Sequence, residues 1–271
     1  MWRVGTTELK RVAVYERSIR ASVARIWENV LDWEHLPWLH RTSFSDVRTL
    51  DASRAGWRAW VASRFRGSSE SLVDVRLDRA TLRYVTRTLD GEAVGTEIWT
   101  HLEPETERST RIRVQFDAPG IAPELAAKVG DGYLRLYSRL WDEDEAMMMR
   151  RQAILDERGG RLPLWPREGA GVPLGPLAEL RKRLPLVLRV AGCELRLIEL
   201  DREIRAHPTI CPHRGGPLGE AAIDDGCLTC PWHGYRYDLR SGRCVNGHRF
   251  HLGPLPRVRL DPASGDAALY W

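Results

Sequence analysis

The chain has 271 residues, of which 43% are hydrophobic and 29% charged, a globular composition that excludes disordered, collagen-like and disulfide-framework proteins. Its net charge is +4, and the basic residues are scattered rather than clustered on one face, so no nucleic-acid partner is predicted. It contains no apolar run of about 18 residues and no signal-peptide core, so we expect a cytoplasmic protein without a membrane span. The five cysteines are interpreted as metal ligands or reduced thiols.

The first half of the chain begins with a strand and a helix. Residues 11–15 alternate as a strand does, and Ser22 is the predicted N-cap of a helix whose apolar residues recur at helical spacing. Pro37 should end that helix by about Leu36. An antiparallel series of strands is then predicted over residues 56–65, 71–77, 81–88, 94–102 and 110–116.

Residues 123–155 change to a helical period with one apolar stripe, which Gly130 and Gly132 could divide. A strand, a helix, a run of strands and a long closing helix over residues 8–157 resemble the helix-grip fold of the START and polyketide-cyclase (SRPBCC) superfamily. The resemblance implies a curved sheet wrapped around the last helix, with a cavity for an apolar molecule. We therefore predict an α+β helix-grip domain over residues 1–157.

Residues 158–176 are rich in glycine and proline, which interrupt any regular period and predict a linker. Beyond the linker, short strand-like runs between Gly/Pro loops predict a small all-β domain over residues 177–271. Residues 158–271 carry 17 basic and 12 acidic side chains, whereas residues 1–157 carry 24 basic and 25 acidic ones. The second half is therefore the basic one.

Two short segments of the second half carry a cysteine and histidine pattern. Cys211-x-His213 lies in CPHRGGPLG, and Cys230-x2-His233 follows in CPWHG after sixteen intervening residues. Two cysteines on one iron and two histidines on the other are the ligands of a Rieske [2Fe–2S] cluster. Zinc is the alternative for a Cys2His2 set, but zinc sites usually pair Cys with Cys and His with His along the chain.

Residues 177–271 resemble Rieske ferredoxin and oxygenase domains. Cytochrome bc-type Rieske proteins have a disulfide at the positions of Gly216 and Trp232, so that disulfide cannot form here. Tyr235 replaces their sulfide-bonding serine, whereas Tyr237 matches their tyrosine. Fewer hydrogen-bond donors predict a potential in the lower part of the roughly −150 to +300 mV Rieske range. The other cysteines are interpreted as buried small apolar residues: Cys193, Cys227 and Cys244.

A second candidate metal site lies where the first predicted helix meets Pro37. Residues 28–40, ENVLDWEHLPWLH, contain Asp32-x2-His35-x4-His40, which resembles the iron-binding segment of Rieske non-haem iron oxygenases, whose catalytic domains are helix-grip folds. The resemblance implies that His35 and His40 are two arms of an Fe(II) facial triad. It also implies that Asp32 bridges a cluster histidine of one unit to an iron-binding histidine of another. The alternative is a pair of core histidines without metal.

In the resembled family, the third iron ligand is a carboxylate of the closing helix. At about 100° per residue, Asp144 falls inside the apolar stripe, whereas Asp142, Glu143 and Glu145 point away from it or to its flank. A carboxylate on a buried face is costly unless it is paired or binds metal, which selects Asp144 as the third ligand. A salt bridge to a buried arginine is the alternative.

The preferred interpretation is a Rieske-type non-haem iron oxygenase with the domain order of the family reversed. Its [2Fe–2S] cluster would pass electrons to a mononuclear Fe(II), and oxygen from O2 would be inserted into a hydrophobic, aromatic or polycyclic substrate. No dinucleotide fingerprint is present, so an NAD(P)H-dependent reductase or a ferredoxin would supply electrons, docking on the basic half. A homo-oligomer with electron transfer between chains is expected.

Two other classes of protein are consistent with the sequence. One is a Rieske electron-transfer or redox-sensing protein whose metal-free helix-grip domain binds a lipid or another apolar ligand. The other is a cofactor-independent cyclase or hydrolase with an accessory cluster. The distinguishing feature is whether the side chains of His35, His40 and Asp144 converge within metal-binding distance.

Overall fold

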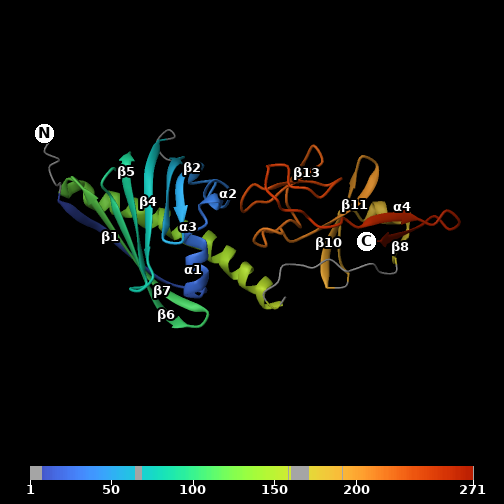
Figure 1. Ribbon diagram of the computed structural model, residues 1–271, viewed down its shortest axis with the longest axis horizontal. Coiled ribbons are helices and arrows are strands. Elements are labelled where there is room, and N and C mark those ends of the chain that lie inside the picture. The colour runs from blue at the N-terminus through green and yellow to red at the C-terminus, as the bar shows by residue number, and fades with distance from the viewer. Residues whose placement is uncertain (1–7, 65–68, 158, 160–170, 191, 271) are drawn as a thin grey trace. The chain divides into compact units, whose positions relative to one another are not determined.

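The computed structural model describes residues 8–64, 69–157, 159, 171–190 and 192–270 (Figure 1). The chain divides into two units, Met1–Gln152 and Ala153–Trp271. Each unit has its own sheet and its own hydrophobic core. Within the part of the chain that the structure describes, no helix is long and apolar enough to cross a membrane.

The first unit is built on a seven-stranded antiparallel sheet with the strand order β1-β7-β6-β5-β4-β3-β2. Its strands are β1 Leu9–Ile19, β2 Phe44–Ser53, β3 Gly56–Ser63, β4 Glu70–Asp78, β5 Arg83–Gly91, β6 Glu97–Thr106 and β7 Ser109–Pro119. Each predicted strand is present, although Phe65, the predicted end of β3, lies outside the described residues. The sequence missed β2 because this edge strand is mostly exposed and carries little apolar alternation.

Three short helices connect β1 to β2: α1 Val23–Val30, η1 Trp33–His35 and α2 Leu36–Leu39. The Ser22 hydroxyl caps α1 by accepting a hydrogen bond from the backbone N–H of Arg25 at 3.3 Å. The predicted end of this helix near Leu36 was wrong, because α1 ends at Val30 and Pro37 lies in the first turn of α2. Proline is tolerated there because the first N–H groups of a helix have no partner inside the helix.

The long helix α3, Pro123–Glu157, packs against the sheet and completes the helix-grip fold (Figure 1). Phe116 of β7 stacks on Tyr133 of α3, with ring centroids 4.9 Å apart. The two glycines do not divide this helix. A Cβ at Gly130 would lie 2.3 Å from the carbonyl oxygen of Val12, so glycine at this position permits the close approach of α3 to β1.

The second unit is β-rich, with a six-stranded sheet of order β8-β16-β15-β11-β10-β9 and a three-stranded sheet β12-β13-β14. The larger sheet and its short helix comprise β8 Val172–Pro176, α4 Leu177–Lys182, β9 Leu186–Val190, β10 Cys193–Leu200, β11 Glu203–Pro208, β15 Arg257–Leu260 and β16 Asp266–Tyr270. The smaller sheet comprises β12 Ile223–Asp224, β13 Cys227–Thr229 and β14 Arg236–Asp238. The loop that precedes β12 and the loop between β13 and β14 carry the cysteine and histidine motif.

The end of the predicted linker is part of this second fold. Residues 158 and 160–170 lie outside the described residues, whereas Val172–Pro176 pairs with β16 as strand β8. The linker prediction was therefore wrong over these five residues. Because β8 is an edge strand, its two prolines need not donate ladder hydrogen bonds. The composition that indicated a linker is equally compatible with an edge strand.

Candidate functional site

Each motif cysteine begins a loop, and the two loops share one pattern of backbone hydrogen bonds, here called the frame. The N–H of Cys211 donates to the carbonyl of Gly216 at 2.9 Å, and the N–H of Gly215 donates back to Cys211 at 3.0 Å. In the second loop, Cys230 donates to Tyr235 and Gly234 donates back to Cys230, both at 2.9 Å. The fifth residue of each frame is a glycine with positive φ, +87° at Gly215 and +66° at Gly234. This left-handed conformation favours glycine, which explains the position of one glycine in each motif.

The four motif side chains converge between these loops. Cys211 and Cys230 are 1% and 0% exposed, and the imidazole centroids of His213 and His233 lie 4.5 Å apart. A hydrogen bond from the Cys230 thiol lowers the pKa of Cys211 to about 7. Two thiols and two imidazoles, one of each from each loop, are the donor set of a Rieske cluster.

The surroundings of the cysteines also fit a cluster. A Cβ at Gly216 would lie 2.5 Å from the Cys230 sulfur and 3.4 Å from the Trp232 ring. A larger residue at Gly216 would therefore occupy the space beside a ligand sulfur. The hydroxyl of Tyr237 lies 3.3 Å from the Cys211 sulfur, so it is placed to donate a hydrogen bond to the thiolate. The sequence identified both Gly216 and Tyr237 from their positions in the motif.

Aromatic rings cover one of the candidate imidazole ligands. The ring of Tyr235 stacks on His213 with centroids 4.6 Å apart, and His248 stacks on Tyr235 at 4.0 Å. Tyr235 is buried, whereas His248 is exposed. Where bc-type proteins have a serine hydroxyl, this chain thus places a ring against a ligand. No sequence pattern indicates a role for His248, because it lies outside both ligand motifs.

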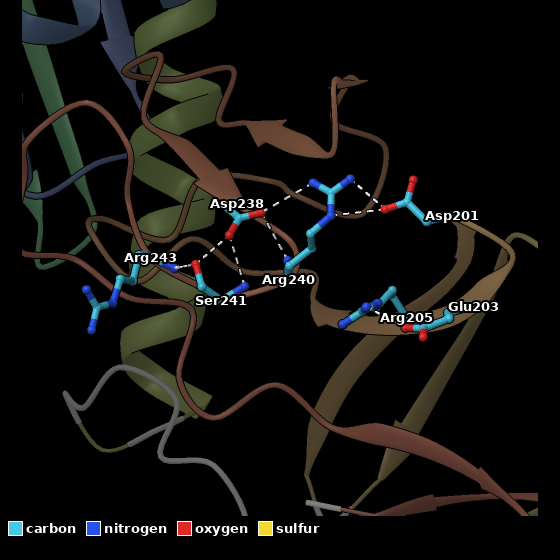
Figure 2. Close-up of polar contacts among 7 residues, drawn as sticks. All are labelled: Asp201, Glu203, Arg205, Asp238, Arg240, Ser241 and Arg243. Atoms are coloured by element: carbon cyan, nitrogen blue, oxygen red, sulfur yellow. Dashed lines mark hydrogen bonds and ion pairs between the residues drawn. The ribbon is translucent and has the colours of Figure 1, made fainter.

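A polar network fixes the turn that follows β14 and Tyr237 (Figure 2). The Asp238 carboxylate accepts hydrogen bonds from the backbone N–H groups of Arg240 at 3.2 Å and Ser241 at 3.0 Å. Burial alone would raise the pKa of Asp238, but a hydrogen bond from the Ser241 hydroxyl, together with these two backbone bonds, outweighs burial and lowers the pKa. The Arg240 guanidinium also binds Asp201, with its Nε 3.0 Å from Oδ2. The turn therefore anchors the strand that carries Tyr237.

The remaining cysteines are not all buried. Cys193 is buried, whereas Cys227 and Cys244 are partly exposed. The prediction of a buried apolar role was therefore wrong for the latter two. Both lie beside the short β13–β14 hairpin, where strands of three residues cannot cover both of their faces.

In the first unit, the structure brings together His35, His40 and Asp144, with one ligand atom of each within 4.8 Å of the others. His35 ends η1, His40 follows α2, and Asp144 lies on α3. The Asp144 Oδ1 atom lies 3.4 Å from His35 Nε2 and 3.2 Å from His40 Nε2. Two imidazoles and one carboxylate are the donor set of a facial triad, and they fit Fe(II).

The three side chains share a buried, charged environment. Their exposed fractions are 5% for His35, 2% for His40 and 14% for Asp144. Burial alone would raise the pKa of Asp144, but the imidazoles of His40 and His35 and a 2.9 Å hydrogen bond from the Asn29 amide lower it. Burial likewise opposes protonation of His40, yet the neighbouring carboxylates raise its pKa. Within the described residues, the partners of Asp144 do not include the arginine of the alternative interpretation.

Asp32 lies next to this group. Its Oδ2 atom is 3.9 Å from His35 Nδ1, and the Asp32 side chain is 5% exposed. This distance is longer than a hydrogen bond. The predicted bridge from Asp32 to a cluster histidine stays a prediction.

Of the three other acids of residues 142–145, which were predicted to point away from the apolar stripe or to its flank, Glu143 is the one that the structure places at the site. Glu143 Oε2 lies 2.6 Å from His40 Nδ1, whereas Glu145 is 3% exposed and pairs with Arg17 and Arg20. The helical period predicts the angle of each side chain around α3, but it does not predict which elements pack against each flank of the helix. The α2 segment covers the side of Glu143, and the end of β1 covers the side of Glu145. Glu143 is thus a site residue that sequence reasoning missed.

Comparison with known proteins identifies the second unit. The family model described as Rieske [2Fe-2S] domain matches residues 171–253. Aminopyrrolnitrin oxygenase PrnD of Pseudomonas fluorescens is 36% identical over 84 residues, covering 29% of this chain and 21% of that protein. The oxygenase component of dicamba O-demethylase of Stenotrophomonas maltophilia is 38% identical over 73 residues, covering 26% and 21%. The anthranilate 1,2-dioxygenase ferredoxin subunit of Burkholderia cepacia is 34% identical over 71 residues, covering 26% and 65%.

The chain therefore contains a Rieske [2Fe–2S] domain similar to those of oxygenases, and the matches span about a fifth of the length of those oxygenases. Among solved structures, the Zhui aromatase/cyclase from Streptomyces sp. R1128 is 13% identical with a TM-score of 0.44, covering 54% of this chain and 96% of that one. A START superfamily protein from Mycobacterium smegmatis is 18% identical with a TM-score of 0.40, covering 51% and 96%. The helix-grip fold of the first unit follows from its own sheet order and closing helix.

Proposed function

We propose that the protein is a Rieske-type non-haem iron oxygenase that inserts oxygen from O2 into a hydrophobic, aromatic or polycyclic substrate. The observation that carries the proposal is the convergence of His35, His40 and Asp144 within 4.8 Å in a chain that also contains a Rieske domain. When bound, the [2Fe–2S] cluster would supply electrons and the mononuclear Fe(II) would supply a site for dioxygen.

The residues of the first unit hold and orient the reacting groups. The amide of Asn29 donates to Asp144 Oδ1 at 2.9 Å and so restrains the carboxylate next to the two imidazoles. The hydrophobic core of the first unit includes the buried aromatic side chains of Trp27, Trp57 and Phe116. Such a core suits an apolar substrate.

Two tyrosines near Asp144, the buried Tyr84 and the partly buried Tyr137, add polar groups to this apolar environment. Burial raises the pKa of Tyr84 and of Tyr137, and the Asp144 carboxylate raises both further. Both hydroxyls therefore stay protonated at neutral pH and can donate hydrogen bonds. They are suited to orient a polar group of an otherwise hydrophobic substrate.

The partners belong to the same proposal. An NAD(P)H-dependent reductase or a ferredoxin would reduce the cluster, and the basic second half suits an acidic donor. The exposed ring of His248, stacked on Tyr235, is a place where such a donor could approach. In a homo-oligomer, Asp32 would link an iron-binding histidine of one chain to a cluster histidine of the next.

A second candidate function is that of a Rieske electron carrier or redox sensor whose first domain binds an apolar ligand without iron. The similarity to the Burkholderia cepacia ferredoxin subunit, over 65% of the length of that protein, supports this alternative. A carrier has no need of two imidazoles and a carboxylate that share one buried point. The geometry of the triad therefore favours the oxygenase.

The test is oxygen incorporation from 18O2 into a panel of aromatic and polycyclic compounds, with a reductase as electron source. We expect labelled product from the Fe(II)-loaded full chain and none from His35→Ala or His40→Ala, with the Rieske absorption spectrum intact in both variants. Labelled product from the variants would contradict the iron assignment. Reversible reduction of the cluster without product from any compound would favour the electron carrier.

A further inference from the structure

The four consecutive acids of α3 divide into two pairs by what they contact. The outer acids, Asp142 and Glu145, form ion pairs with Arg17. The inner acids, Glu143 and Asp144, contact the imidazole of His40 from two sides. The outer pair therefore connects α3 to β1, whereas the inner pair belongs to the candidate metal site.

The contact of Glu143 with His40 determines which imidazole nitrogen faces the site. His40 Nδ1 donates a hydrogen bond to Glu143 Oε2 at 2.6 Å, and His40 Nε2 lies 3.2 Å from Asp144 Oδ1. A hydrogen bond from an imidazole N–H to a carboxylate is charge-assisted and strong. Because the Nδ1–H bonds to Glu143, Nε2 is the imidazole nitrogen directed at the point where the triad converges, and its lone pair is the one that would bind a metal.

The two imidazoles of the triad are held differently. Asp32 Oδ2 lies 3.9 Å from His35 Nδ1, whereas Glu143 Oε2 lies 2.6 Å from His40 Nδ1. His40 is 2% exposed and Glu143 is 28% exposed, so the hydrogen bond connects a buried ligand to a carboxylate at the edge of the core. Glu143 therefore restrains the imidazole ring of His40 through its Nδ1 atom.

We propose that Glu143 is a positioning residue of the metal site, which fixes the tautomer and orientation of His40 and so strengthens binding of a divalent metal. The inference rests on the proposed function, because it needs a metal at the triad. It adds a residue that the family resemblance did not supply and that the sequence placed away from the site. Removing the carboxylate partner of a metal-binding imidazole typically weakens metal binding about 10- to 100-fold.

The experiment measures the dissociation constant of Co(II) at the triad of the full chain, with the cluster assembled and the mononuclear site first cleared by a chelator. Equilibrium dialysis gives the constant, and low-temperature EPR of high-spin Co(II) reports the ligand geometry, since the oxidised cluster gives no EPR signal. The variants are Glu143→Ala and Glu143→Gln. The matched control is Asp142→Asn, which removes one negative charge from the adjacent position of the same helix.

We expect the dissociation constant to rise about 10- to 100-fold in Glu143→Ala, with an altered Co(II) EPR spectrum. The dissociation constant of Glu143→Gln should rise less, because the amide oxygen still accepts the Nδ1 hydrogen bond, although it carries no charge. Asp142→Asn should have the same dissociation constant and Co(II) EPR spectrum as the wild type. All variants should retain the absorption spectrum of the cluster.

Wild-type affinity and EPR spectrum in both Glu143 variants would overturn the positioning role while leaving the metal site in place. A wild-type chain that binds no Co(II) outside the cluster would overturn the proposed iron site, and the positioning role with it. If Glu143→Ala does not fold, Glu143→Gln decides, and an unchanged constant in that variant overturns the inference.

Discussion

In the second unit, the four candidate cluster ligands lie on two loops that repeat one backbone hydrogen-bond frame. In the first unit, the three candidate metal ligands come from η1, from the residue that follows α2 and from α3, and side-chain contacts bring them together. The first arrangement is encoded locally, by cysteine, histidine and glycine at fixed spacing. The second depends on the packing of a helix against segments that lie far from it in the sequence. The cluster ligands can therefore be predicted from spacing alone, whereas predicting the triad also needed the family resemblance and the helical period of α3.

The largest expected effect comes from a substitution in a cluster loop, which should disturb the cluster site and leave the triad unchanged. Gly216→Ala would place a Cβ 2.5 Å from the Cys230 sulfur, so this ligand must shift, and we expect a marked decrease of the Rieske absorption and circular dichroism. Binding of Co(II) at the triad should persist, because the triad does not depend on these loops. Gly132→Ala is the control, since a Cβ there meets no atom within 4 Å and alanine favours a helix by about 1 kcal/mol. Normal cluster content in Gly216→Ala would contradict the account of this loop.

The effect expected next in size concerns His207, the residue of β11 just before the first cluster loop. Burial lowers the pKa of His207 to about 4, compared with about 6.5 in an unfolded chain. Because the folded pKa is the lower one, the unfolded chain binds more protons between these values, and stability falls as pH falls from 6.5 towards 4. The loss approaches about 3 kcal/mol at the acid end, at about 1.4 kcal/mol per pH unit.

The measurement for His207 is urea unfolding at pH 5 and pH 7, comparing the wild type with His207→Gln. The difference between the two proteins removes the contribution of the other titrating groups. We expect the wild type to lose more stability than the variant between these two pH values. Equal losses of stability in the wild type and the variant would mean that His207 has the same pKa in the folded and the unfolded chain.

The sequence predicted both ligand motifs, the helix-grip and Rieske folds, and the presence of six strands of the first sheet. It placed Asp144 on the inner face of α3, because an apolar stripe defines that face wherever the helix packs on a sheet. It missed β2, β8 and Glu143 for one physical reason. An edge strand and a helix flank have partners that are set by tertiary packing, and the pattern along the chain carries no record of those partners.

The smallest expected effect concerns a residue that contacts a cluster ligand without being a ligand itself. Tyr237→Phe removes a hydroxyl 3.3 Å from the Cys211 sulfur. A hydrogen bond to the thiolate favours the reduced cluster, so its loss should lower the reduction potential by about 50 mV, which corresponds to about 1 kcal/mol for one electron. Voltammetry of the full chain measures this shift. A potential equal to that of the wild type would show that the hydroxyl does not act on the cluster.

The central claim is that one chain holds two different iron centres, and the content of iron and acid-labile sulfide tests it most directly. Protein purified anaerobically and reconstituted with Fe(II) should contain about three irons for every two sulfides, and His35→Ala about two, since a Rieske cluster accounts for two of each. Two irons for every two sulfides in both proteins would contradict the second iron site. The chain would then be a Rieske electron carrier joined to a domain that binds an apolar ligand.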